Sequence, residues 1–160
     1  MRRAFSMLVA IFTIVILSLV ASYIFYTSSN ITKVGSLQYK KEQAILLARS
    51  YTEYAVMAIS ANDRENTNSC LEYINATIGP NPANGEGYRV RVVITYIGNE
   101  RYIKNCTRKA AELQNSDIDT LSAIIDVYVE YKDILNASVH NGFNALVPWQ
   151  TYHKRSLQKI

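Results

Sequence analysis

An uninterrupted apolar run fills most of the first thirty residues of the chain. From Ala4 to Tyr26 every residue is apolar, aromatic or a small hydroxyl, and no charge follows until Lys33. In lipid such a stretch satisfies its backbone hydrogen bonds only as a helix, and serine and threonine can bond back to that helix. At about 1.5 Å per residue the helix reaches roughly 30 Å or slightly more, the thickness of a hydrocarbon core. The run therefore predicts a membrane-spanning helix.

A second helical pattern follows a polar patch at residues 27–32. Apolar residues recur there at steps of three and four, which places them on one helical face: Ala44, Leu47, Ala48, Tyr51, Tyr54, Ala55 and Ala58. Charged residues fall on the opposite face: Lys40, Lys41, Glu42, Arg49 and Glu53. We expect the soluble half of one long helix, with its apolar face packed on a sheet.

The periodicity changes to two after a polar break at residues 61–69. In 87–99, Tyr88, Val90, Val92, Ile94 and Tyr96 share one face; in 121–133, Ile125, Val127, Val129 and Tyr131 do the same. A weaker strand or short helix is expected at 70–78, and 151–160 would close the sheet. Helix-forming composition at 107–117 predicts a short helix or variable loop, and 136–149 reads as a long surface loop. The order predicts an α+β fold, a long N-terminal helix and an antiparallel sheet.

Charge placement predicts the orientation of the chain. Arg2 and Arg3 precede the apolar run and no basic excess lies just beyond it, so the N-terminus is expected in the cytoplasm and the rest outside. The run is longer than the apolar region of a cleavable secretory signal, although Val20 and Ser22 offer a small-residue exit. The net charge of +4 forms no basic stripe with interleaved aromatics, which argues against nucleic-acid binding.

The chain holds two cysteines, Cys70 and Cys106. In an oxidising space an isolated pair in a small domain is most simply a disulfide. The alternative is two buried thiols in a reducing compartment. Zinc binding is a poorer reading, because His140 and His153 lie far from both cysteines and no pair has zinc-like spacing.

The N-terminal sequence RRAFSML resembles the class III leader of type IV pilins and pseudopilins. In that family a short basic leader ends in a small residue, and a dedicated membrane peptidase cuts before a phenylalanine whose new amine is methylated. The resemblance implies a cut between Ala4 and Phe5, so that Met1 to Ala4 are removed while the apolar helix stays on the protein.

This chain departs from the family pattern at two positions. Ala4 replaces the usual glycine before the cut, and both residues are small. Val9 stands where the mature chain usually has glutamate, which in the family offsets the buried N-terminal amine of a neighbouring subunit, since an unpaired ion in lipid is costly. Val9 cannot do this, which favours a minor or tip subunit over a major one.

The expected organisation is a leader at residues 1–4, a membrane-spanning or filament-core helix at 5–27, its amphipathic continuation at 28–61, and a β head with one disulfide at 62–160. The resemblance implies a non-enzymatic subunit of a type II secretion pseudopilus or type IV pilus, anchored by a single pass in the inner membrane. Implied partners are other pilin-like subunits, the prepilin peptidase, an inner-membrane assembly platform and lipid. The alternative is a signal-anchored binding domain that never polymerises, with tyrosine-rich strands as its contact surface.

No motif predicts an enzyme, a cofactor or a metal site. Asp117 and Asp119 form a D-x-D pair that could ligate calcium, but the pair lacks the ligand count calcium needs, so a solvated turn is the preferred interpretation. Four N-x-S/T sequons begin at Asn30, Asn75, Asn105 and Asn136, and in an asparagine-rich chain such sequons arise readily by chance.

Overall fold

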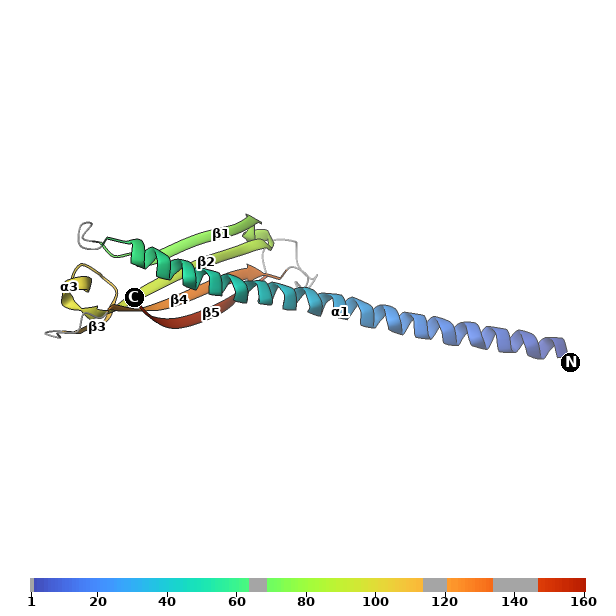
Figure 1. The fold of residues 1–160 in the computed structure, drawn as a ribbon. Coiled ribbons are helices and arrows are strands. Elements are labelled where there is room, and N and C mark those ends of the chain that lie inside the picture. The colour runs from blue at the N-terminus through green and yellow to red at the C-terminus, as the bar shows by residue number, and fades with distance from the viewer. Residues whose placement is uncertain (1, 64–68, 114–120, 134–146) are drawn as a thin grey trace. The chain divides into compact units, whose positions relative to one another are not determined.

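The computed structural model describes residues 2–63, 69–113, 121–133 and 147–160 (Figure 1). It divides into two compact units, Met1–Tyr39 and Lys40–Ile160. The division falls inside helix α1, Arg2–Ala61, so the two parts of this helix are described separately.

The first unit is helical and contains the apolar run. Val9–Ser28 is long and apolar enough to cross a membrane, and none of it is buried. Its hydroxyls bond back as the sequence predicts: Thr13 donates to the carbonyl of Ala10 at 2.8 Å, and Ser22 to that of Ser18 at 2.8 Å. These contacts leave the helix without unsatisfied hydroxyls at those positions, as an apolar surrounding requires.

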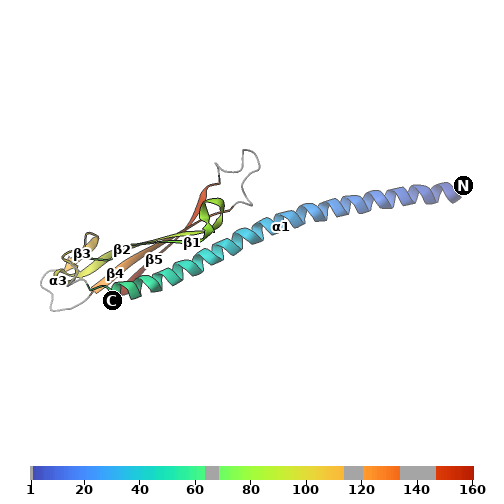
Figure 2. The ribbon, with the colours of Figure 1, turned by 90° about the horizontal axis from the view of Figure 1, so that it is seen from above.

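The second unit, here called the head, is a sheet with the C-terminal part of α1 across one face (Figures 1 and 2). Four strands run antiparallel in the order β1-β2-β4-β5, and a short fifth, β3, pairs parallel with the end of β2. Their bounds are Tyr73–Asn81 for β1, Glu86–Asn99 for β2, Lys109–Leu113 for β3, Leu121–Lys132 for β4 and Trp149–Lys159 for β5. A 3-10 turn, Pro82–Asn84, joins β1 to β2, and a short helix α3, Glu100–Ile103, follows β2. The α+β prediction is confirmed.

The core of the head lies between α1 and the sheet. Alanines at 44, 48 and 55 are fully buried there, together with Ile59. The central strands supply the opposite side: Val90, Val92, Ile94, Tyr96, Ala123, Ile125, Val127 and Val129. Small residues on the helix let its backbone approach the sheet closely, while branched residues on the sheet fill the space. The two faces predicted from the period-two pattern are thus confirmed.

Most expected strands are present, and one segment was predicted wrongly. The weaker candidate at 70–78 contains a strand, not a short helix, and 151–160 lies in β5 except for its last residue. Residues 107–117 were expected as a helix or loop, but Lys109–Leu113 forms β3. Its pairing with Tyr96 to Asn99 overrides the helix propensity of the segment. Residues 136–146 of the loop expected at 136–149 lie outside the described residues, and its last residue, Trp149, is already the first residue of β5.

Two positions on α1 also differ from the predicted faces. Tyr54 was placed on the buried face but is 52% exposed. Lys40 was placed on the solvent face, yet its ammonium donates to the carbonyls of Gly85 at 3.3 Å and Lys132 at 2.9 Å. The charge sits at the rim of the sheet, where a long side chain can reach carbonyls at the strand ends.

Candidate functional site

The apolar segment of α1 is the first candidate site. Ala4 and Phe5, the expected processing residues, lie in the helical backbone, and Val9 is 44% exposed. Large neighbours such as Phe12 and Leu17 are more than 60% exposed. Such a surface is stable only against lipid or against other apolar helices. The segment is compatible with a signal anchor or with a single membrane span.

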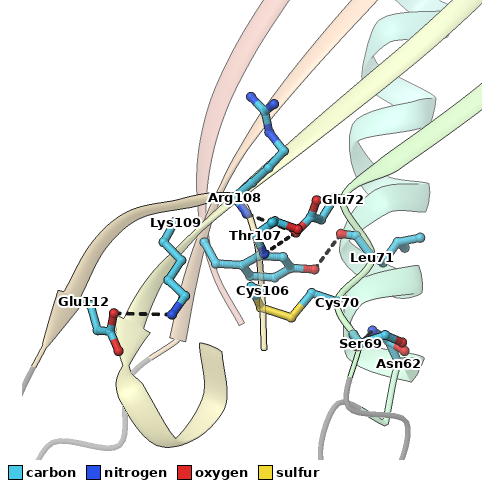
Figure 3. Close-up of a disulfide and its surroundings, with 11 residues drawn as sticks. Asn62, Ser69, Cys70, Leu71, Glu72, Cys106, Thr107, Arg108, Lys109 and Glu112 are labelled. Atoms are coloured by element: carbon cyan, nitrogen blue, oxygen red, sulfur yellow. Dashed lines mark hydrogen bonds and ion pairs between the residues drawn. A yellow bond between two sulfur atoms is a disulfide. The ribbon is translucent and has the colours of Figure 1, made fainter. Parts of the chain in front are cut away.

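The disulfide forms the second candidate. Cys70 and Cys106 are bonded, with their Cα atoms 5.1 Å apart (Figure 3). The bond joins the segment entering β1 to the segment entering β3. The disulfide predicted from cysteine usage is present, and it is the feature that fixes this corner of the head.

Glu72, beside the disulfide, holds the same corner by hydrogen bonds. Its carboxylate accepts from the backbone N–H of Thr107 at 2.6 Å and of Arg108 at 3.0 Å (Figure 3). Partial burial opposes ionisation, but these hydrogen bonds outweigh it and lower the pKa of Glu72. The Tyr96 hydroxyl donates to the carbonyl of Leu71 at 2.7 Å. Both N–H groups donate to the same oxygen, Oε1, and so tie Glu72 to the segment that enters β3.

The outer face of the sheet, the face away from α1, brings together a charged cluster that the sequence did not predict. Asp126 on β4 accepts from the Arg155 guanidinium at 2.7 and 3.0 Å, and His153 Nε2 lies 2.7 Å from its Oδ1. The Arg155 hydrogen bonds, with those of His153, lower the pKa of Asp126 despite burial. The His153 ring stacks on Tyr128, with centroids 4.4 Å apart. Antiparallel register between β4 and β5 creates the cluster, since Asp126 faces Arg155 and Tyr128 faces His153.

A shallow open hollow of about 240 Å³ lies beside this cluster, over β1, β2 and β4. Its polar lining comprises Asn75, Thr77, Arg89, Arg91 and Glu130. Strand register explains the group, because Asn75 pairs with Arg91, Thr77 with Arg89, and Arg89 with Glu130. The signal in the sequence was the charged half of the RVRV alternation, which marks an outer face but does not reveal its neighbours.

The other sequence candidates are dispersed. Asn75 and Asn105 are exposed in the head, and Asn30 lies on α1. Asp117, Asp119, Asn136 and His140 lie outside the described residues. Within the described ranges, no group of three or more His, Cys, Asp or Glu side chains is arranged to hold a metal ion.

Compared with known protein families, with curated proteins and with solved structures, the chain gives no match. Its function is therefore argued from the architecture and the chemistry of these sites.

Proposed function

We propose that the chain is a pilin-like structural subunit, held in the inner membrane by its N-terminal helix and built into a type II secretion pseudopilus or a type IV pilus. The observation that carries the proposal is the order of parts. An exposed apolar helix leads into a disulfide-linked head in which the same helix packs on an antiparallel sheet.

The apolar segment suits a subunit that leaves lipid for a helical filament. Its side chains are apolar all around and its hydroxyls are bonded internally, for example Ser18 to the carbonyl of Val15 at 2.8 Å. A surface of this kind exchanges lipid contacts for contacts with other apolar helices without uncovering a polar group. Assembly thus needs no chemistry beyond packing.

Processing would act at the N-terminal end of this helix. A peptidase that recognises the small side chain of Ala4 would cut before Phe5 and leave the anchor intact. The helix would then begin with an amine that carries a positive charge near neutral pH, and a single methyl group on the nitrogen keeps that charge. In this chain Val9 offers no carboxylate to that amine, so we assign the subunit a minor or tip position.

The decisive experiment is the intact mass and N-terminal sequence of the protein purified from its native membrane. The proposal expects a chain that begins at Phe5 and is heavier by one methyl group. Ala4→Leu should block the cut, because a branched side chain replaces a methyl group at the recognised position. Ala10→Leu makes the same substitution inside the apolar segment and should be processed normally.

Recovery of a chain that keeps Met1 to Ala4, or normal assembly of uncut Ala4→Leu protein, would contradict the proposal. The alternative function is a stationary anchor carrying a binding head. Val9 and the charged outer face of the sheet favour it, and it expects an intact N-terminus in cells with or without a prepilin peptidase. A chain beginning near Tyr23 would instead mean a secreted soluble head.

A further inference from the structure

The two faces of the sheet differ in what covers them. One face packs on α1, while no described element lies over the other (Figure 2). On that outer face Arg89 and Arg91 are exposed, and neither forms an ion pair with any described residue. Side chains two residues apart on one strand lie on the same face, so both arginines are on the side of the sheet away from α1.

Asp126 and the two arginines differ in whether their charges are compensated by an ion pair within the described chain. The Asp126 carboxylate is already saturated by Arg155 and His153, so that cluster is complete within the chain. Arg89, by comparison, lies over the Trp149 ring at 4.2 Å, which orients its guanidinium without neutralising it. Arg91 lies between Asn75 and Tyr128 in the register, next to an amide and an aromatic ring.

The hollow that these side chains line has the size of a side-chain subsite. About 240 Å³ is below the usual range of small-molecule pockets, roughly 300 to 1,000 Å³, and the hollow is open to solvent. Guanidinium groups bind carboxylates through paired charge-assisted hydrogen bonds. Asn75 and Thr77 offer further polar contacts at the opposite wall.

Glu130 decides between classes of partner. Its carboxylate lines the same hollow as Arg89 and Arg91, so the site is dipolar and not uniformly basic. A phosphate backbone would meet repulsion from Glu130 and carries no cationic group to pair with it. A polypeptide offers both kinds of partner. Its carboxylates pair with the arginines, and its N–H groups or lysines pair with Glu130.

We propose that the outer face of the sheet is a docking site for an acidic segment of a partner protein, whose carboxylate side chain pairs with Arg89 and Arg91 in the hollow while a neighbouring lysine or N–H group of the segment pairs with Glu130. This goes beyond the anchoring and assembly proposed above and does not depend on cleavage before Phe5. A processed or an unprocessed chain presents the same site.

The test measures binding to the full-length chain in detergent micelles by fluorescence anisotropy. The probe is a fluorescein-labelled Gly/Ser peptide carrying glutamates with neighbouring lysines. The comparison probes are the same peptide with glutamine at each glutamate position and a labelled oligothymidylate. Arg91→Gln should weaken binding of the acidic peptide by about tenfold or more, because a charge-assisted contact is lost. Lys159→Gln removes the same charge from the far end of the same face and should change affinity by less than about twofold.

A third variant, Glu130→Gln, checks the dipolar character of the site. This variant should bind the lysine-containing acidic peptide more weakly, because the lysines lose their carboxylate partner. It should bind the oligothymidylate more tightly, because a repelling charge is removed. The proposal is overturned by equal losses in Arg91→Gln and Lys159→Gln, by equal binding of the glutamine peptide, or by absence of binding. Tighter binding of the oligothymidylate to the unmodified chain would overturn the assignment to a polypeptide. Because Arg91 forms no ion pair with a described residue of the head, its replacement should leave the fold intact, which circular dichroism of each variant verifies.

Discussion

The two parts of α1 place the same kind of backbone in opposite surroundings. In Val9–Ser28 the large apolar side chains are outside, from 44% exposed at Ile16 to 80% at Phe25. In the part that belongs to the head, Ala48 and Ile59 are fully buried against the sheet. The first part carries large apolar side chains on every side, whereas the second carries alanine on the face that packs against the sheet.

Different interactions stabilise the two parts of α1. The first part depends on its surroundings, because apolar side chains without protein neighbours gain from lipid or another helix. The second part depends on tertiary packing and on the cross-link at Cys70, as helices of this length do in water. Disturbing the head should therefore leave the apolar helix in place.

Loss of the disulfide should have the largest effect. A bridge across a sequence separation of 36 restricts the unfolded chain and stabilises the head by about 4 kcal/mol. Cys70→Ser combined with Cys106→Ser should lower the free energy of unfolding of the head by about that amount. Chemical denaturation in micelles, followed by tyrosine and tryptophan fluorescence, measures the loss. Circular dichroism should still report the helix of Val9–Ser28 after the head has unfolded. Unfolding of this helix together with the head would contradict the independence of the two parts.

Matched isoleucine truncations compare the two parts of α1 directly. Ile59→Ala should cost about 2 to 3 kcal/mol, since the side chain is fully buried but lies near the end of the helix, where neighbours can relax. Ile11→Ala makes the same change at a position that is 60% exposed and should shift head stability by less than about 0.5 kcal/mol. Denaturation midpoints of both variants provide the measurement. Equal losses would mean that the head depends on the apolar segment.

The smallest effect is expected at the charged cluster of the outer face. Because the pKa of Asp126 lies below its ordinary value of 3.8, its ion pairs stabilise the folded head fully above that pH and are lost as pH falls through the lower folded-state pKa. Asp126→Asn should cost about 1 kcal/mol at neutral pH, a modest figure because Arg155 is largely exposed. It should also reduce the acid destabilisation of the head.

Thermal unfolding of the Asp126→Asn variant between neutral and strongly acidic pH supplies the comparison. Glu130→Gln is the matched control, since it removes a carboxylate from the same strand and the same face. That control should retain the acid sensitivity of the unmodified head. If Asp126→Asn and the control lose stability identically as the pH falls, the ion pairs of Asp126 do not contribute to the acid sensitivity of the head. Glu72, whose pKa is also lowered, leaves a residual acid sensitivity in both variants.

How far the sequence predicts the molecule depends on the range of the interactions. Helix and strand periods follow local patterning, so the apolar run and the buried faces of β2 and β4 were predicted. The disulfide was predicted because only two cysteines exist. β3 was not, because Lys109–Leu113 is a strand only through its pairing with β2.

The outer-face features required the strand register. Asp126 and Arg155 are 29 residues apart, and only the β4–β5 pairing makes them neighbours. The hollow likewise needs three strands in register before Arg89, Arg91 and Glu130 meet. Lys40 was misplaced for the same reason, because its partners are carbonyls at the far ends of other elements. Alternation identifies a face, but not what a residue meets on it.

The position of the disulfide has a mechanical consequence. Once the packing of α1 on the sheet gives way, tension along the chain enters the sheet at the start of β1, an edge strand whose hydrogen bonds to β2 would open one after another if pulled from that end. The bond from Cys70 to Cys106 diverts the pull before it reaches Tyr73, into the segment that leads to β3 and β2. A covalent link resists far more force than a hydrogen bond, so the head should resist unzipping when its anchor is pulled and become weak under the same pull once the bond is reduced.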